Sequence, residues 1–181
     1  MNFREEVISR IAQLLERLVI EDSQTQDGPE SDILYLTPNQ NYNTPLRQVL
    51  LDPIESATGD VDVPTLWVSF DGGRNDLGAR TFNSHLVEVL SIRLDLVLSK
   101  KCGLEDEGKV RPITLQISDA LADIQKILTV SMVTTAVTTP QAQVNSLYLG
   151  EWTLDERFRG GEQEVLNIRL DLEVENPLEV S

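Results

Sequence analysis

One nine-residue pattern of apolar and polar positions occurs twice in this chain. Residues 88–96 and residues 164–172 are identical except at one position, which is Ser91 in the first copy and Asn167 in the second. Within each copy, leucine, isoleucine and polar residues alternate so that the aliphatic side chains share one face. A period of two predicts two β-strands, each with one buried face and one more polar face.

Two other segments have the three- and four-residue apolar spacing of amphipathic helices. The first covers residues 3–20, where Asn2 is placed as an N-cap and Glu5 follows three positions later, as in a capping box. The second begins near Pro112, which a first helical turn tolerates, and extends to about residue 128. We expect both helices to pack their apolar stripes against the sheet.

Two further strands complete a repeated order of elements. Residues 65–71 and 147–155 are rich in β-branched and aromatic side chains, and each segment precedes one copy of the repeat. We expect Gly72 and Gly73 to end the first of these strands, and Gly160 to lie in the turn after the second. The order of elements is therefore αββ-αββ. Either an internal duplication or convergence on a simple strand pattern would explain the repeat. This order predicts an α+β fold in which two helices cover one face of an antiparallel or mixed sheet.

The remaining segments lack clear periodicity. Residues 21–64 contain five of the eight prolines and predict a long extended loop, with a short strand at 33–36. Such a loop either reaches a neighbouring subunit or is a mobile excursion of a monomer. Residues 100–109 predict an exposed polar connection, and residues 129–144 predict a loop or a weak strand.

Length and composition fit one soluble domain spanning residues 1–181. The apolar fraction of 40% suffices for a core, and a single cysteine, Cys102, allows neither an intrachain disulfide nor a cysteine-based metal site. The N-terminal residues do not resemble a signal peptide, and no apolar run is long enough to span a bilayer. We therefore expect a protein that does not bind membranes.

The formal net charge of −15 is the most distinctive bulk property. Tight binding to a phosphate backbone requires charge of the opposite sign. The sign of the net charge alone leaves two interpretations of the acidic surface open. One is a solvated acidic surface that limits aggregation, and the other is a surface that lies near nucleic acid without binding it.

The sequence offers little chemistry for catalysis or for ligand binding. His85 is the only histidine, so a metal shell has no second histidine to complete it. A catalytic triad would have to use His85, and no Gly-x-Ser-x-Gly elbow accompanies it. Residues 71–78 lack the lysine and the following helix of a phosphate loop, and residues 105–108 lack the ligand spacing of a calcium loop. We therefore expect no catalytic residue, no cofactor and no metal, and a protein that is not an enzyme.

The polar face of the repeat provides the only candidate site. Arg93 and Asp95 occupy this face in the first copy, and Arg169 and Asp171 occupy it in the second. If the two strands are neighbours, cross-strand pairing of arginine with aspartate would form a charge ladder. Exposed ion pairs contribute only about 0 to 1 kcal/mol each. We therefore interpret these four residues as facing a neighbouring subunit or the lumen of an assembly.

The order of elements resembles that of the tail terminator, or tail completion, proteins of long-tailed bacteriophages. The resemblance covers most of the chain and depends on the topology, on strands 84–99 and 147–175, and on the final hairpin that ends in Asn176 and Pro177. It includes no diagnostic motif, and residues 21–64 do not match the family pattern residue by residue. No catalytic residue of the family exists to be transferred.

The resemblance implies a structural virion protein. Such a protein forms a ring, most often a hexamer, at the head-proximal end of the tail tube, and it joins the tube to neck or connector proteins and in some particles to the sheath. DNA passes through the ring without specific binding, which an acidic inner wall would favour. The protein would be assembled in the host cytoplasm and would end in the virion tail.

Two alternatives remain at this stage. The first is another neck, tail-tube or head-tail connector component of the same kind of particle. The second is a small-molecule-binding or hydrolytic α+β enzyme with its site between the sheet and residues 21–64.

Overall fold

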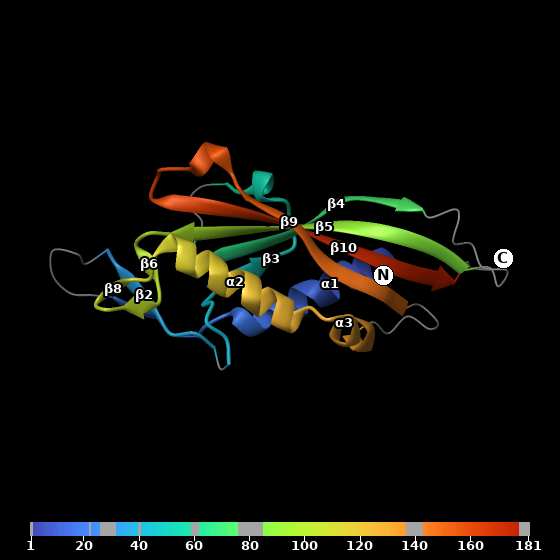
Figure 1. Cartoon of the computed structure of the whole chain (residues 1–181), viewed down its shortest axis with the longest axis horizontal. Coiled ribbons are helices and arrows are strands. Elements are labelled where there is room, and N and C mark those ends of the chain that lie inside the picture. The colour runs from blue at the N-terminus through green and yellow to red at the C-terminus, as the bar shows by residue number, and fades with distance from the viewer. Residues whose placement is uncertain are drawn as a thin grey trace.

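A computed structural model describes residues 2–21, 23–25, 32–39, 41–58, 62–75, 85–136 and 143–177. It shows the predicted α+β class, with helices packed on one face of a mixed sheet (Figure 1). The helices are α1 (Phe3–Leu15), α2 (Ile113–Ile127) and α3 (Val130–Ala136), with 3₁₀ segments η1 (Glu16–Leu18), η2 (Ile54–Ser56) and η4 (Glu156–Phe158). The long strands are β4 (Thr65–Asn75), β5 (His85–Ser99), β9 (Gln143–Leu154) and β10 (Gln163–Pro177). The short strands are β1 (Ser23–Thr25), β2 (Leu34–Leu36), β3 (Gln48–Leu50), β6 (Cys102–Gly103), β7 (Glu105–Asp106) and β8 (Lys109–Val110).

Two long antiparallel hairpins form the centre of the sheet. β4 pairs with β5, β10 pairs with β9, and the two hairpins join through antiparallel pairing of β5 with β10. β3 lies parallel to β4 at one edge, and β9 forms the opposite edge. β6, β2 and β1 extend the sheet from the end of β5.

The two copies of the repeat are therefore direct neighbours. Their register places Arg93 opposite Arg169, so equivalent residues are related by a local two-fold axis at this pair. Each Asp then lies opposite the one position that differs between the copies: Asp95 faces Asn167, and Asp171 faces Ser91.

The aliphatic faces of the repeat strands form the centre of the core, as the alternation predicts. Their side chains are at most 2% exposed and pack with the apolar stripes of α1 and α2. Figure 1 shows the helices below the sheet, seen nearly along its edge. The repeat-strand members of this core are Leu90, Ile92, Leu94, Leu96, Leu98, Leu166, Ile168, Leu170 and Leu172.

Polar contacts attach the helices to the sheet and to the loops. The capping box of α1 is confirmed, because Asn2 accepts a hydrogen bond from the Glu5 amide and the Glu5 carboxylate accepts one from the Asn2 amide. Arg4 then pairs with Glu88 of β5 at 2.8 Å. On α2, the buried Asp123 carboxylate accepts hydrogen bonds from two consecutive loop amides at 2.9 and 2.8 Å, which fixes residues 43–44 against the helix.

Residues 129–144 and the Gly-Gly segment differ from the predictions. The first contains α3, whose Val133 is fully buried in the core, where a loop or weak strand was expected. Gly72 and Gly73 do not end their strand, because β4 absorbs a bulge after Phe70 and continues to Asn75. At Gly72 the backbone has a φ of 139°, a conformation that side-chain-bearing residues rarely adopt.

The segments expected to be loops contain short strands. Residues 34–36 form β2, as predicted, and the segment between residues 48 and 63 lies against the sheet through β3 and a small apolar cluster. The connection at 100–109 is not fully exposed, because Cys102 and Gly103 are buried in β6. Residues 76–84, which include part of the predicted glycine-rich loop, and the side chain of His85 lie outside the described residues. Among the helices described, none is long and apolar enough to cross a membrane.

Replacement of a central core leucine tests this arrangement. Leu94→Asp should prevent folding, because an unpaired carboxylate would be buried at a position that is 0% exposed, at a cost comparable to the roughly 5–15 kcal/mol that stabilises a domain. Thr153→Asp, on an exposed position of β9, is the matched control and should retain the wild-type circular dichroism spectrum. A folded Leu94→Asp variant would contradict the assignment of this face to the core.

Candidate interaction surface on the outer face of the sheet

The outer face is the side of β4, β5, β10 and β9 that points away from the helices. Its two ends differ in what covers them. In Figure 1, η2 (teal) and η4 (orange) lie above one half of the sheet, while no described helix lies above the other half. We call these the covered end and the open end.

A second, smaller apolar cluster lies under the covering segment. Trp67, Val97 and Val165 are each at most 5% exposed on the outer face. The segment that includes η2 packs onto them with the side chains of Leu50, Ile54, Ala57 and Val63. The covered end is therefore an internal contact of this chain.

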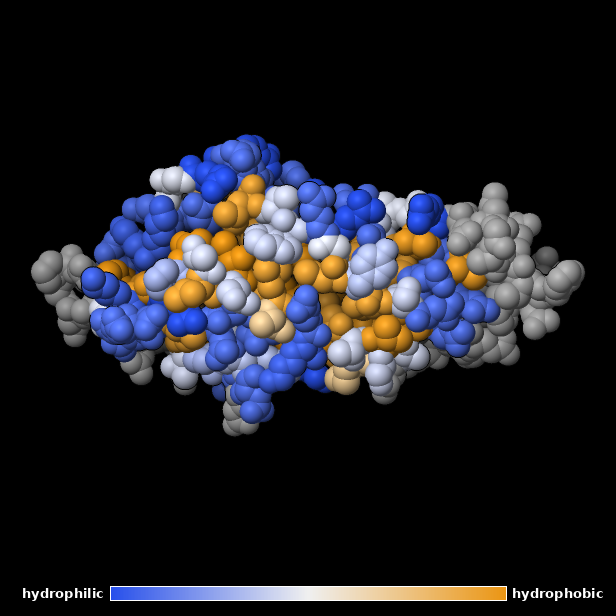
Figure 2. All heavy atoms as spheres, in the orientation of Figure 1, coloured by the Kyte–Doolittle hydropathy of each residue, from blue (hydrophilic) through white to orange (hydrophobic). Residues whose placement is uncertain are grey.

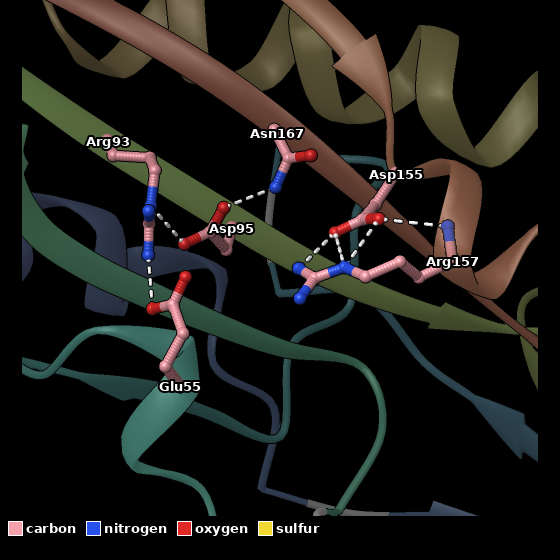
Figure 3. Close-up of polar contacts among 6 residues, drawn as sticks. All are labelled: Glu55, Arg93, Asp95, Asp155, Arg157 and Asn167. Carbon is pink, nitrogen blue, oxygen red and sulfur yellow. Dashed lines mark hydrogen bonds and ion pairs between the residues drawn. The ribbon is translucent and has the colours of Figure 1, made fainter.

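A charge network at the covered end connects η2 to the repeat (Figure 3). Arg93 donates to Asp95 at 2.7 Å and to Glu55 of η2 at 2.5 Å. Asn167 of the second repeat donates to the other oxygen of Asp95 at 2.5 Å. One arginine thus joins a carboxylate of the sheet to a carboxylate of the segment that covers it.

Burial governs the electrostatics of this network. Asp95 is 0% exposed, and loss of solvation raises the pKa of its carboxyl, although Asn167 and Arg93 act in the opposite direction. Glu55 is exposed, and its backbone amide together with Arg93 lowers the pKa of that carboxyl. Neighbouring Arg157 of η4 is held by Asp155, to which its guanidinium donates at 2.6 Å.

The open end contains the second copy of the same residues. Arg169 donates to Asp171 at 3.1 Å and to the hydroxyl of Ser91 at 3.2 Å, and Ser91 in turn donates to Asp171 at 2.7 Å. The Arg169 side chain is 54% exposed, and Asp171 raises the pKa of its guanidinium. The Arg169 guanidinium is therefore accessible from solvent, while the Asp171 side chain, 15% exposed, is only partly so.

These groups line a shallow polar hollow of about 290 Å³. The bulged, glycine-containing part of β4 forms one side of the hollow, and Tyr148 of β9, 59% exposed, forms the other. The hollow combines two arginines with two aspartates, so it is close to neutral on a strongly acidic chain. Its lining consists of Asp71, Gly72, Gly73, Arg74, Val89, Ser91, Tyr148, Arg169 and Asp171.

The predicted charge ladder is therefore only partly correct. The two strands are neighbours, but each arginine pairs with the aspartate two residues along its own strand. Across the strands, the contacts to the aspartates come from Asn167 and Ser91, the one divergent position of the repeat. The antiparallel register explains this outcome, because it places the two arginines opposite each other.

Asp95 requires a correction as a candidate residue. It was expected to face a subunit or a lumen, yet it is fully buried within its own chain by the segment that carries η2. Arg93 is also engaged internally, through Glu55 and Asp95. Arg169 and Asp171 remain candidates for contact with another molecule.

The sequence pattern did not identify the other members of the two ends. Glu55 and Arg157 lie in segments without periodicity, and Asp155 is the last residue of a predicted strand, so no pattern links these three residues to one site on the sheet. Arg74 and Tyr148 depend on the bulged course of β4 and on the register of β9. Ser91 and Asn167 could have been found, since antiparallel pairing of the repeat with its two arginines opposite each other places each of them opposite an aspartate.

A second hollow lies where an enzymatic site had been considered, between the sheet and the 21–64 segment. It measures about 330 Å³ and is lined by residues of the 48–62 segment and by Trp67. Among the residues that the structure describes, none forms a hydrogen bond with the indole Nε1 of Trp67. The described lining offers two carboxylates, Asp52 and Asp62, but no histidine or cysteine. In the described part of the chain, no group of three histidine, cysteine, aspartate or glutamate side chains is placed to hold a metal ion.

The two ends should respond differently to the same substitution. Arg93→Glu should destabilise the fold by about 3–5 kcal/mol, because it removes the partner of a fully buried carboxylate and adds a third negative charge beside Glu55. Arg169→Glu, the equivalent change in the second repeat, should change the free energy of unfolding by no more than about 1 kcal/mol, because Arg169 is 54% exposed and solvent screens its ion pair with Asp171. Urea denaturation of both variants measures the difference, and equal losses would contradict the distinction between the ends.

The buried carboxylate should also give a characteristic pH dependence. Because burial raises the pKa of Asp95, the folded chain binds a proton there at a higher pH than the unfolded chain does. Between the two pKa values the folded state holds more protons, so this group lowers stability as pH rises. Asp95→Asn removes the titration. The unfolding free energy of the wild type minus that of the variant should therefore decrease with pH above the ordinary aspartate pKa, and an increase would contradict the burial of Asp95.

The similarity of this chain to known proteins lies in its fold and not in its sequence. No protein-family model matches the chain, and no curated protein sequence matches it. The fold is similar to that of a chain in the virion of a native gene transfer agent particle, with 9% sequence identity and a TM-score of 0.43. The match covers 71% of this chain and 78% of that chain. At this level of similarity the match assigns no function.

Proposed function

We propose that this chain is a structural protein of a phage-like virion, specifically a tail terminator. In this role, copies of the chain form a ring, of six subunits in the expected case, at the head-proximal end of the tail tube. The ring ends the tube and joins it to neck or connector proteins, and to the sheath where one is present. The protein performs no catalysis in this role.

The open end of the outer face carries the proposal. It presents Arg74 and Arg169 beside Asp71 and Asp171. Asp71, Arg74 and Arg169 are exposed, and Asp171 is partly buried. Exposed ion pairs contribute little to the stability of a monomer. Between subunits, the same charges steer the encounter and fix the orientation of the partner.

The net charge supports the choice of this surface for contacts between copies. Each subunit has a formal charge of −15, so copies repel one another wherever acidic surface meets acidic surface. The hollow at the open end contains equal numbers of arginines and aspartates, so approach there avoids this repulsion. In a ring, each subunit contacts the next through two different surfaces, one on each subunit. The charged groups of the hollow would then pair with oppositely charged groups on a different surface of the neighbouring subunit.

The acidic surface also fits the passage of DNA. A duplex binds proteins mainly through cations that neutralise its phosphates, and this chain has twice as many carboxylates as lysines and arginines. A ring with an acidic lumen would let DNA move through it without being retained. The resemblance in the order of elements supports a terminator over another neck, tube or connector component.

Ring formation and its dependence on the open end can be tested together. The purified protein, alone and with tail-tube protein, should form rings visible by negative-stain electron microscopy. Arg169→Glu should abolish or strongly reduce them, because it makes the hollow acidic. Arg17→Glu, the same charge change at an exposed position on the helical side of the fold, should leave them intact.

The two parts of the proposal fail separately. Only monomers in every condition, tube protein included, would rule out the ring. Rings that form equally well with Arg169→Glu would leave the ring in place but rule out the open end as its contact surface.

A further inference from the structure

The edge strand β9 has a long unpaired side. Among the described strands, β9 pairs only with β10, through two register shifts. Near its start, the hydroxyl of Thr134 on α3 donates to the carbonyl of Val144 at 3.5 Å. Residues 146–154 have no such contact from another described element, so half of their backbone donors and acceptors face outward.

The two edges of the central sheet differ in protection. The edge formed by β3 is three residues long and is followed by Asp52 and Pro53, which is typical of an edge that does not accept another strand. β9 has 12 residues, contains neither proline nor lysine, and carries one charge, Glu151. A long, sparsely charged edge of this kind is a template for pairing with another strand.

An apolar groove runs beside the free edge. It lies between α2 and β9, has a volume of about 280 Å³, and contains no charged side chain. Figure 2 shows apolar surface gathered in this region of the molecule. A strand added to an edge uses backbone hydrogen bonds for affinity and places alternate side chains into an adjacent groove. The groove is lined by Ile124, Gln125, Leu128, Leu147, Tyr148, Leu149 and Leu170.

The occupant of this edge must be an extended segment with few charges and with apolar residues on one face. β9 itself has these properties, since Leu147, Leu149 and Trp152 point to the side of the helices while only one of its residues is charged. The chain as a whole has a formal net charge of −15, which opposes association between copies wherever acidic groups meet. At the β9 edge, which has a single charged residue, two identical chains can therefore approach with little electrostatic repulsion.

We infer that β9 pairs antiparallel with β9 of a second copy of this chain. A two-fold axis perpendicular to the sheet would join the two sheets into one and place the helices of both copies on the same side. The Leu147 and Leu149 side chains of each copy would then lie beside the groove of the other. This contact is isologous and goes beyond the proposed ring, whose contacts are heterologous.

Sedimentation velocity over a wide range of protein concentrations tests the pairing. The wild type should pass from monomer to dimer, and Trp152→Lys should weaken dimerisation at least tenfold, because it places a charge on an edge whose partner carries the same charge across the axis. Leu115→Lys is the matched control, because it removes an exposed apolar side chain from α2 away from β9, and it should leave dimerisation unchanged. Circular dichroism must show both variants folded.

Disulfide crosslinking provides a second readout that does not depend on a destabilising change. The only native cysteine is buried, so single cysteines at the exposed positions Tyr148, Glu151 and Thr153 report on β9 alone. A two-fold pair predicts self-crosslinking that is greatest at the position nearest the axis and decreases along the strand. A monomer at all concentrations, or association without self-crosslinking from β9, would overturn the inference. Rings lost on Arg169→Glu but dimers retained would show that the two contacts are separate.

Discussion

The pairing of β5 with β10 is the constraint on which the rest of the structure depends. Two nearly identical strands that pair antiparallel with equivalent positions in register must place one residue opposite its own equivalent, and here Arg93 lies opposite Arg169. Like charges directly opposite each other destabilise a sheet. The spacing of the repeat resolves this conflict, because each arginine binds the aspartate two positions away on its own strand. Ser91 and Asn167 then hold those aspartates from the opposite strand.

The same local sequence acquires two different environments because the segments around it differ. Around Arg93, residues 48–58 and 62–63 lie over the strand, and Asp95 is fully buried beside the apolar cluster that they cover. Around Arg169, β4 bulges at Gly72 and leaves a polar hollow open to solvent. The Arg93–Asp95 pair therefore stabilises the fold internally, because removing the arginine from a desolvated carboxylate costs a large part of the free energy of unfolding. Because Arg169 is solvated, it can leave Asp171 and form an ion pair with a carboxylate of another molecule.

The sequence was sufficient to predict the fold where periodicity is long and was insufficient where contacts are remote. The alternation of the repeat and the stripes of the two helices placed their boundaries within a few residues, and the capping box at Asn2 was correct because capping is a local interaction. The helix at 130–136 was missed because its seven residues are rich in threonine and valine, which favour helices weakly, and its stability comes from Val133 in the core. The burial of Asp95 could not be predicted, because it accompanies the packing of the η2 segment, about 40 residues earlier in the chain, onto the neighbouring apolar cluster.

The strong acidity of the chain restricts where it can make contacts, and this restriction gives its surfaces different roles. A uniformly acidic surface opposes every association between copies, so contacts are favoured only where charge is balanced or scarce. The structure provides one surface of each kind: the hollow beside Arg169 balances its charges, and the edge of β9 nearly lacks them. The first suits orientation through ion pairs, and the second suits pairing through backbone hydrogen bonds and apolar burial. Because the two surfaces use different physical interactions, salt should weaken contacts at the hollow much more than contacts at the edge.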